Sequence, residues 1–477
     1  MQLFKSKLKK ISENEFEIPR EGDMKVPGKI FMNEKLLETI EDKTIQQIMN
    51  VATLPGIVGH SIAMPDAHMG YGCCVGGVLA IDIKEGCISP GAIGYDLNCG
   101  MRLLKTNLER EQVTTKIKDL LNQIFRRVPC GVGKGGDIKL SREQFDEVLM
   151  KGARWAVENG MGDEEDLIYC EESATHKDAK PEFVTQSAYK RGKAQLGSLG
   201  AGNHFLEIQY VDKVFDNKVA ETFGLRENQV VIMIHCGSRG TGHQVCSDYL
   251  RMIEKEMPEI MKSLVDRELA YAPIDSELGK KYYGAMCACA NYAWCNRHII
   301  GYNIRESFKS VFPDVEVKTV YDVAHNLGKI EEHIVNGEKR ELLVHRKGAT
   351  RSFPKMRPEL PDAYKEVGQP VIIPGSMGTS SYVLVGGEKS MEISFGSTAH
   401  GAGRVMSRRK AKEDFDAQTI TNELESRDIH IKSASFRGIV EEAPGAYKDV
   451  DEVVKVSDAL GIGKLVARLK PMGVIKG

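Results

Sequence analysis

The chain has 477 residues, of which 42% are hydrophobic and 28% are charged. These fractions are typical of a folded globular protein and exclude a disordered chain, a collagen-like fibre and a membrane-embedded bundle. The 65 Lys and Arg residues nearly balance the 67 Asp and Glu residues, which gives a formal net charge of −2. Any nucleic acid must therefore bind in a local basic groove, because the whole molecule is not a polycation.

The N-terminal segment is charged throughout and contains neither the apolar region nor the cleavage site of a signal peptide. The longest apolar runs, such as residues 230–234, are too short to span a bilayer. The 11 cysteines are scattered and form no C-x-x-C pair, which argues against a disulfide framework and a zinc ribbon. We therefore expect a cytoplasmic protein with no membrane segment.

Helical and strand-like patterns follow one another irregularly along the chain. Helices are predicted over residues 34–50, 109–127, 142–158, 244–256, 411–424 and 450–459, and residues 277–311 are predicted to form one long helix or two stacked ones. Strands are predicted over residues 75–81, 101–106, 205–209, 230–234, 315–323, 341–345, 371–373 and 382–385. Because the strands occur in clusters, we expect a mixed α+β fold rather than a doubly wound parallel sheet. Length alone suggests about three domains.

Several nucleotide-binding and hydrolase motifs are absent or lack the right context. Residues 131–136, GVGKGG, match G-x-G-x-x-G, but they follow a predicted helix where a dinucleotide fold needs a strand. We interpret them as a flexible glycine loop. The sequence contains no G-x-x-x-x-G-K-[ST], K-x-D-G or H-E-x-x-H motif. These absences argue against a P-loop NTPase, a lysine-adenylating ligase and a common type of metalloprotease.

Five segments combine a potential metal ligand with a glycine-rich turn or the end of a predicted strand. They are GAIGYDLNCGMR, GSLGAGNHFLEIQ, VVIMIHCGSRGTGH, TVYDVAHNLGK and GSTAHGAGR. Their carboxylate, imidazole and thiolate groups together suit a divalent ion such as Mn, Fe, Co or Zn. The repetition of this pattern favours a metal site over isolated structural histidines. Asp66, His68 and His243 are interpreted as supporting or packing residues.

Positive charge gathers in residues 190–193, 345–351 and 404–412, although the chain as a whole is balanced. The glycine-rich turns 374–381 and 400–404 can direct backbone N–H groups toward an anion. A solvated charged face is the alternative interpretation. Residues 408–410 open a predicted helix, where positive charge opposes the helix dipole and a bound anion would offset the cost. This arrangement mildly favours phosphate binding.

Taken together, these segments resemble the RtcB family of RNA-splicing ligases. The resemblance rests on GYDLNCG, LGAGNHFLE, HCGSRG, AHN, VHRKGATR, PGSMGTSSY, HGAGR and EEAPGAYKDV, in that order, and it covers nearly the whole chain. It implies one compact α+β unit over residues 1–477, with a β-sheet core flanked by helices, in place of three domains.

The resemblance also implies an activity. Such ligases use GTP and Mn²⁺ to join an RNA 3′-phosphate or 2′,3′-cyclic phosphate end to a 5′-hydroxyl end. They act through a histidine–GMP intermediate and an activated RNA-3′-pp-G end, in tRNA splicing or RNA repair. The need for an archease-type activator is left open, and a monomer is the default expectation.

Site residues follow from the resemblance by motif match. Cys99 would bridge two manganese ions, with Asp96 and His204 completing one site and His235 and His325 the other. His400 would be the nucleophile that receives GMP. The nucleotide would be surrounded by Asn203, Glu207, Ser376, Ser381, Gly401, Ala402, Gly403, Arg404, Tyr447 and Lys476. Of these, Tyr447 would stack on guanine. RNA phosphates would be held by Arg191, Arg239, Lys347 and Arg408.

Two of these roles set geometric conditions. A regular strand through residues 204–208 would place His204 and Glu207 on opposite faces, so both can serve one site only if the strand begins after His204. Lys476 lies beside the chain end, where disorder is the default, so its role requires a tail that is tied into the fold.

Two other functions remain open. A metal-dependent phosphoesterase or nuclease acting on RNA ends would use the metal ligands for hydrolysis and would need neither His400 nor guanine recognition. An RNA-binding protein with a decayed ligase site is the second alternative, and the presence of the reactive residues argues against it.

Overall fold

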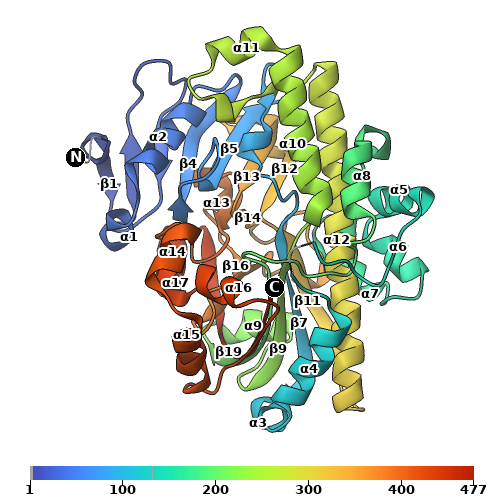
Figure 1. Cartoon of the computed structure of the whole chain (residues 1–477). Helices are drawn as coiled ribbons and strands as arrows, with labels where there is room; N and C mark the ends of the chain where they lie inside the picture. Colours follow the sequence, from blue (N-terminus) through green and yellow to red (C-terminus); the bar gives the residue numbers. More distant parts are fainter. Residues whose placement is uncertain (1–3, 132) are drawn as a thin grey trace.

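The structure is a computed structural model that describes residues 4–131 and 133–477. Val132 of the predicted glycine loop and the first three residues of the N-terminal segment lie outside the described residues. The described chain contains one seven-stranded sheet, one eight-stranded sheet and many helices, so the predicted mixed α+β fold is confirmed (Figure 1).

The seven-stranded sheet has the order β1-β2-β3-β4-β5-β13-β12. Its strands are β1 (Lys9–Ser12), β2 (Glu15–Ile18), β3 (Gly28–Ile30), β4 (Ile57–His68), β5 (Val75–Asp82), β12 (Asn326–Val335) and β13 (Glu338–Lys347). The pairing is antiparallel except between β3 and β4. This sheet therefore joins the N-terminal quarter of the chain to a hairpin from its second half.

The eight-stranded sheet has the order β11-β7-β9-β8-β19-β16-β15, and β18 pairs with β19 beside this path. Its strands are β7 (Gly100–Glu109), β8 (Phe205–Val214), β9 (Gln229–Cys236), β11 (Val317–Ala324), β15 (Pro370–Ile373), β16 (Ser381–Gly386), β18 (His430–Ser433) and β19 (Gly463–Lys476). Two-stranded pairs are formed by β6 (Cys87–Ile88) with β10 (Ala272–Pro273) and by β14 (Ala349–Arg351) with β17 (Ser397–Ala399).

Alternating side chains bury both faces of the eight-stranded sheet. Leu104, Ile232 and Ile234 belong to the cluster that packs against α4 (Ile117–Arg127) and the C-terminal half of α12 (Glu277–Val311). Their neighbours along the same strands, such as Leu103 and Met233, belong to a separate cluster with Phe223 and Tyr364. This period of two is what a strand buried on both faces requires.

The remaining helices surround the two sheets. They are α1 (Glu34–Glu38), α2 (Asp42–Val51), α3 (Arg110–Thr114), α5 (Arg142–Lys151), α6 (Ala153–Glu158), α7 (Glu165–Ile168), α8 (Gln186–Gly192), α9 (Asn217–Phe223), α10 (Arg239–Glu256), α11 (Pro258–Ser263), α13 (Ser390–Ile393), α14 (Arg408–Asp414), α15 (Ala417–Glu425), α16 (Phe436–Glu441) and α17 (Val450–Leu460). Among the described residues, no helix combines the length and the apolar character needed to cross a membrane.

The predicted strands are all present, but several predicted helices are divided. The helix predicted over residues 142–158 breaks at Gly152, whose φ of 61° is left-handed and whose missing side chain leaves room for the carbonyl of Ala174. The helix predicted over residues 411–424 is α14 followed by α15, because Asp416 leaves the helix and caps α15 through the amide of Thr419. Residues 34–50 and 109–127 likewise form two helices each.

The stretch at residues 277–311 is one helix, which settles the alternative left open by its sequence. The side chains of α12 are buried along nearly its whole length, including Tyr282, Tyr292 and Trp294. Figure 1 shows α12 running beside both sheets, and it contacts β9 in one sheet and β12 in the other. One hydrophobic cluster also contains residues from Phe16 to Ile462. This shared core favours the expectation of a single unit over residues 1–477, which stays a prediction.

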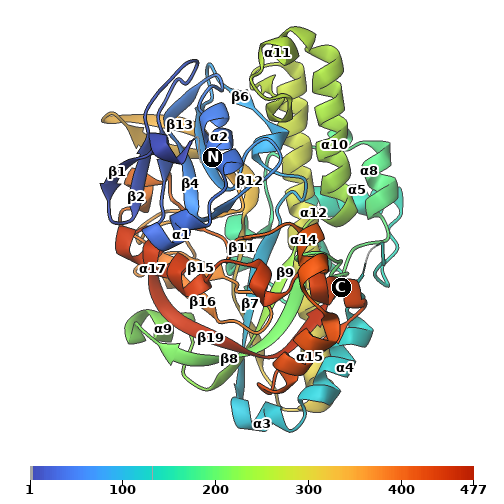
Figure 2. The same ribbon diagram turned by 60° about the vertical axis from the view of Figure 1, so that its left-hand side comes forward.

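One C-terminal helix packs against the N-terminal sheet. In Figure 2 the red helix α17 lies below the blue elements α1 and β4, and α17 contacts β4 directly. The final strand β19 runs through the eight-stranded sheet between β8 and β16. The C-terminal part of the chain therefore contacts the seven-stranded sheet through α17 and belongs to the eight-stranded sheet through β19.

Candidate functional site

Ligand-type side chains gather where neighbouring strands of the eight-stranded sheet end. Cys99 directly precedes β7, His235 lies near the end of β9, and His325 directly follows β11. These three strands are adjacent and antiparallel, with Gly100 paired to both Cys236 and Ala324. The amide of His325 donates a hydrogen bond to the carbonyl of Cys99 at 2.8 Å. The predicted convergence at one sheet edge is therefore observed.

The potential ligand atoms form two groups that share one thiol. Sγ of Cys99 lies 3.2 Å from Nε2 of His235, which lies 3.3 Å from Nε2 of His325. Sγ of Cys99 also lies 3.4 Å from Nε2 of His204, which lies 2.8 Å from Oδ2 of Asp96. Within each group the ligand atoms all lie within 4.8 Å of one another. This division is the one that the motif match implied.

His204 reaches this cluster because β8 begins at Phe205, directly after it. The geometric condition set by the sequence is therefore met: His204 belongs to the preceding glycine-rich turn and Glu207 to the strand. Nδ1 of His204 lies 3.1 Å from the carbonyl oxygen of Leu199, which orients the ring so that Nε2 points to Cys99 and Asp96.

The electrostatics of the cluster suit a divalent cation. Burial lowers the pKa of both His235 and His325, so these rings are held in the neutral form that binds metal. Burial and the charge of Asp96 raise the pKa of the Cys99 thiol to about 11, so a nearby cation would be needed to hold it as a thiolate. Although burial opposes it, Cys236, Cys99 and Asp96 raise the pKa of His204. The donor types and the neutral rings of His235 and His325 therefore fit the predicted metal site, whereas Cys99 and His204 would each lose a proton on binding an ion.

His400 lies beside this cluster and is held by a buried carboxylate. Nδ1 of His400 lies 2.6 Å from Oδ2 of Asp66, a fully buried residue of β4. The same oxygen accepts the backbone N–H groups of His400 at 2.9 Å and Gly401 at 3.1 Å. Burial would raise the pKa of Asp66, but the adjacent His400 lowers it overall. The His400 and His325 rings are 4.9 Å apart, centroid to centroid.

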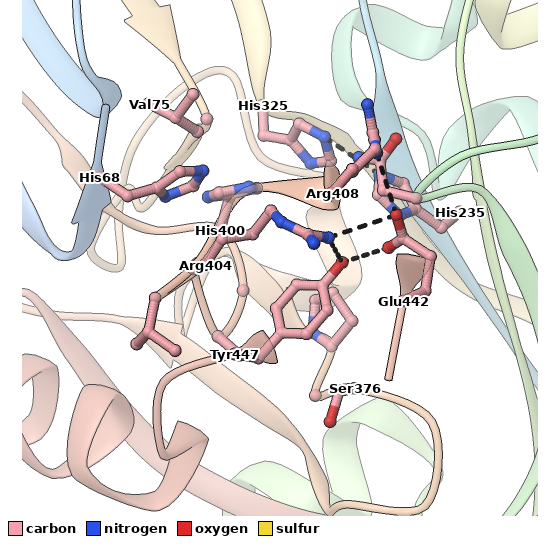
Figure 3. A pocket seen from close by; sticks show the side chains of 18 of the residues that line it. His68, Val75, His235, His325, Ser376, His400, Arg404, Arg408, Glu442 and Tyr447 are labelled. Atoms are coloured by element: carbon pink, nitrogen blue, oxygen red, sulfur yellow. Dashed lines mark hydrogen bonds and ion pairs between the residues drawn. The ribbon is translucent and has the colours of Figure 1, made fainter. Parts of the chain in front are cut away.

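A cleft of about 450 Å³ opens from His400 between the two sheets. His68 and Lys347, which end β4 and β13, line it from the seven-stranded sheet. His235 and Glu207 line it from the eight-stranded sheet. Figure 3 shows His400 and His325 near one another, with Arg404, Tyr447 and Glu442 across the same space. The cleft therefore has His400 at one end and polar or charged side chains, such as Arg404, Tyr447 and Glu442, along its wall.

Most residues predicted to surround a nucleotide line this cleft. They are Asn203, Glu207, Ser376, Gly401, Ala402, Gly403, Arg404, Tyr447 and Lys476. Ser381 does not belong to its lining: the Ser381 hydroxyl accepts hydrogen bonds from Nε2 of Gln209 at 3.0 Å and from the amide of Gly375 at 3.1 Å. Ser381 thus supports the turn that carries Ser376.

Lys476 satisfies the second geometric condition. It pairs with Phe205 of β8 and with Ser433 of β18, so the chain end is tied into the sheet. Its side chain is buried, and Nζ lies 3.8 Å from Oε2 of Glu442. Burial lowers the pKa of Lys476, although Glu442 opposes this effect.

The four residues predicted to hold RNA phosphates occupy different environments. Arg408 lines the cleft, whereas Arg191 is exposed on α8 and donates to Oε1 of Gln244 at 3.0 Å. Arg239 begins α10, and its Nε donates to the hydroxyl of Ser198 at 3.4 Å. Lys347 is buried.

The ammonium group of Lys347 already donates hydrogen bonds to backbone carbonyl oxygens within the fold. It donates to the carbonyl oxygens of Cys73 at 2.9 Å, Gly91 at 2.8 Å and Tyr71. An ammonium group has only three donors, so a phosphate contact through Lys347 would require these interactions to break. The predicted phosphate role of Lys347 therefore stays a prediction that this geometry does not favour.

Glu442 is a residue of the cleft that sequence reasoning did not single out. It is buried and contacts Arg404, Arg408, Lys476 and Tyr447. Its segment, EEAPGAYKDV, carried part of the family resemblance, but only Tyr447 received a role. The pair of adjacent glutamates before a turn was the available signal, and it did not reveal which carboxylate points inward.

The chain is similar to known proteins over most of its length. The family described as tRNA-splicing ligase RtcB matches residues 47–477. A tRNA-splicing ligase RtcB of Thermococcus kodakarensis is 53% identical over 476 residues, covering 98% of this chain and 99% of the relative. The one from Archaeoglobus fulgidus is 51% identical over 476 residues, covering 98% and 99%. An RNA-splicing ligase RtcB homolog 1 of Entamoeba dispar is 46% identical over 468 residues, covering 94% and 87%. With a match that spans most of the sequence, this chain belongs to the RtcB family of tRNA-splicing ligases.

Proposed function

We propose that this RNA ligase joins a 3′-phosphate or 2′,3′-cyclic phosphate end of RNA to a 5′-hydroxyl end, using GTP and Mn²⁺. Family membership supports the reaction class. The observation that carries the mechanism is the position of His400, held by Asp66 and placed between the Cys99–His235–His325 group and the cleft. A hydrolase that uses the ligand cluster alone would need no such histidine at the end of the cleft beside that cluster.

His400 would act first, as a nucleophile on GTP. Asp66 beside Nδ1 favours the tautomer that carries its proton on Nδ1 and leaves the lone pair of Nε2 free. Nε2 attacks the α-phosphorus, a nitrogen–phosphorus bond forms, and the bond to the leaving pyrophosphate breaks. Two Mn²⁺ ions, held by Cys99 with Asp96 and His204 and with His235 and His325, would neutralise phosphate charge when bound.

The second and third steps transfer and release GMP. An oxygen of the RNA 3′-phosphate attacks the phosphorus on His400, which frees the imidazole and yields the RNA-3′-pp-G end. The 5′-hydroxyl then attacks the activated 3′-phosphorus, a phosphodiester forms, and GMP leaves. His400 returns to its starting state, so GTP is consumed to GMP and pyrophosphate while the RNA gains one bond.

The cleft wall suits a purine nucleotide that carries negative charge. Arg404 and Lys476 bring positive charge, and Tyr447 offers an aromatic ring that we propose stacks on guanine. Glu207 is an acceptor for guanine N–H groups. Arg191, Arg239 and Arg408 are proposed to hold RNA phosphates. The monomeric state and the cytoplasmic location stay predictions, and both tRNA splicing and RNA repair, with or without an archease-type activator, are compatible with this proposal.

The test is covalent labelling of the denatured protein after incubation with Mn²⁺ and GTP labelled at the α-phosphate. We expect an acid-labile label that requires GTP rather than ATP and that is lost in His400→Ala. His430→Ala, on β18 and outside this cleft, is the matched control and should label as the unchanged protein does. His400→Ala should keep its bound metal.

Two outcomes would contradict the proposal. Absence of label with every divalent metal would favour the metal-dependent phosphoesterase, which uses the ligand cluster alone. Loss of metal together with label in His400→Ala would make His400 a ligand rather than the nucleophile.

A further inference from the structure

One buried carboxylate in the cleft connects the residues proposed to bind the nucleotide with a residue proposed to bind RNA. Glu442 is only 3% exposed. Its Oε1 lies 3.3 Å from Nη1 of Arg404 and 3.2 Å from Nε of Arg408. Its Oε2 accepts a hydrogen bond from the hydroxyl of Tyr447 and lies 3.8 Å from Nζ of Lys476. Figure 3 shows the first three of these groups converging on it.

We propose that Glu442 is a positioning residue. It holds Arg404 and Tyr447, which are proposed to contact the nucleotide, and it keeps Arg408 paired until an RNA phosphate replaces the Glu442 carboxylate as the partner of that arginine. The inference rests on the proposed ligase function and deepens it. Glu442 would be the group through which binding of the nucleotide and binding of RNA influence each other.

Arg404 and Tyr447, the two partners of Glu442 that are proposed to contact the nucleotide, are held by several further contacts. Arg404 also donates through Nη2 to the carbonyl of Glu441 at 2.8 Å and through Nε to the carbonyl of Met406 at 3.1 Å. Its guanidinium carbon lies 4.9 Å from the centroid of the Tyr447 ring, and Nη1 lies 3.1 Å from the Tyr447 hydroxyl. Glu442 therefore contacts both members of a stacked pair, and its loss would remove the carboxylate acceptor of the Tyr447 hydroxyl and one partner of Arg404.

The RNA side is different because Arg408 can move. Its side chain is 50% exposed, and the ion pairs described for it are with the carboxylates of Glu442 and of Glu441, at 3.2 Å and 3.9 Å. A guanidinium held by carboxylates at a cleft mouth can exchange them for a phosphate, which offers the same planar pair of acceptors. Arg404, by contrast, also donates to backbone carbonyls, so we expect it to remain in place when a phosphate binds.

The charge balance favours such an exchange. Arg404, Arg408 and Lys476 place three positive charges around Glu442, so its carboxylate neutralises only part of the local charge. These cations lower the pKa of Glu442 against the effect of burial, so it remains ionised. An arriving phosphate competes with Glu442 for Arg408 and meets less competition if that carboxylate is neutral.

The experiment uses the full chain with two substitutions at one position. Glu442→Gln keeps the shape and removes the charge, whereas Glu442→Asp keeps the charge and shortens the reach. Glu441→Gln is the control, because the Glu441 side chain pairs mainly with Arg437 and Lys412, reaches Arg408 only at 3.9 Å and leaves the contact with Arg404 to its backbone. The readouts are the KM for GTP in His400 labelling without RNA, and the Kd for a 3′-phosphorylated RNA without GTP.

For Glu442→Gln we expect the two readouts to move in opposite directions. The KM for GTP should rise about tenfold, because charged hydrogen bonds to Arg404 and Tyr447 weaken. The RNA should bind several-fold more tightly, with a salt dependence steeper by about one phosphate contact. Glu442→Asp should raise the KM for GTP and leave the Kd for RNA unchanged, and it carries the test if the glutamine variant does not fold. Glu441→Gln should leave the KM unchanged.

Three results would overturn the inference. One is a KM for GTP in Glu442→Gln equal to that of Glu441→Gln. Another is weaker binding of both GTP and RNA together with a lowered Tm, which would mark general damage to the fold. The third is an equal gain in RNA affinity in both glutamine variants, which would reduce the effect to net charge. Failure of the unchanged protein to become labelled would instead reject the ligase mechanism itself.

Discussion

Asp66, in β4, and His400, which directly follows β17, are far apart in the sequence, yet Oδ2 of the carboxylate and Nδ1 of the imidazole lie 2.6 Å apart. Asp66 is fully buried in β4, and the cleft side of the histidine ring faces the ring of His325. A carboxylate on one nitrogen fixes the proton there and aims the other nitrogen, which is the arrangement that nucleophilic histidine requires.

Asp66→Asn should therefore slow GMP labelling of His400 by on the order of 10²-fold or more, because the amide can favour the wrong tautomer. Bound metal should be unchanged, since Asp66 belongs to neither ligand group. Single-turnover labelling and elemental analysis measure the two effects. Asp82→Asn, at the end of β5, provides the control and should label normally. An unaltered labelling rate in Asp66→Asn would show that orientation by Asp66 is not needed.

Cys99→Ala should remove both bound metal ions, because its thiol is the one donor that the two ligand groups share. Asp96→Ala should weaken only the group that also contains His204. Elemental analysis of the purified proteins distinguishes these cases. Cys246→Ala, which changes a buried cysteine in the core, is the control and should keep its metal. Two metal equivalents retained by Cys99→Ala would exclude the bridging role.

The segments that carry the candidate ligands could be predicted from the sequence, because ligand-type residues lie at strand ends and glycine-rich turns, whereas the division into two groups that share Cys99 was implied by the family resemblance. Cys99, His235 and His325 each lie at the end of an apolar run, and antiparallel pairing brings those ends to one edge. The start of β8 at Phe205 was only a condition in the sequence, since residues 204–208 are compatible with an earlier start. The pairing of β8 with both β9 and β19 fixes the start of β8 at Phe205.

Other features depend on contacts that no local pattern encodes. The role of Asp66 requires β4 to lie beside β17, which is a tertiary contact between the first and last quarters of the chain. Lys347 resembled a phosphate ligand in HRKGATR, but burial turned its ammonium group toward backbone carbonyls. β19 was not predicted, because glycines and Pro471 interrupt its apolar pattern, and its pairing on both sides stabilises it.

Binding of GTP should depend on pH through Glu207. Burial raises the pKa of this carboxyl group to about 7, although Gln209 and Lys476 oppose the shift. If the carboxylate accepts guanine N–H groups, the ionised form binds and affinity rises with pH. Between pH 6 and pH 8 we expect a gain of about tenfold, as the ionised fraction increases around a pKa near 7.

The measurement is equilibrium binding of a fluorescent GTP analogue to His400→Ala, which separates binding from labelling. Glu207→Gln should bind more weakly at pH 8 and show a nearly flat profile, because its amide does not titrate. A profile in Glu207→Gln as steep as in the parent would assign the pH dependence to another group.

The loops that carry the candidate metal ligands are held by a buried ion pair that the sequence did not reveal. Nη1 of Arg297, on α12, donates to the carbonyls of Asn98 at 2.7 Å and of Cys236 at 2.9 Å. Its Nη2 lies 2.7 Å from Oδ1 of Asp322, and Asn98 has a left-handed φ of 52°. Arg297 thus fixes the backbone next to both Cys99 and His235. Arg102 also pairs with Asp322, at 2.8 Å.

Asp322→Asn should destabilise the fold by about 3–5 kcal/mol, because it leaves two buried guanidinium groups without their counter-ion. Although burial opposes it, Arg297 and Arg102 lower the pKa of Asp322. Its contribution is therefore fully present above its unfolded pKa of about 4 and is lost progressively as the pH falls from that value through the lower pKa of the folded state. Urea unfolding at pH 7 and at pH 3.5 measures both effects, and the difference between the variant and the unchanged protein should shrink at the lower pH. Asp362→Asn, an exposed site, should cost little at either pH. A difference that persists undiminished at pH 3.5 would show that packing, rather than the charge of Asp322, stabilises these loops.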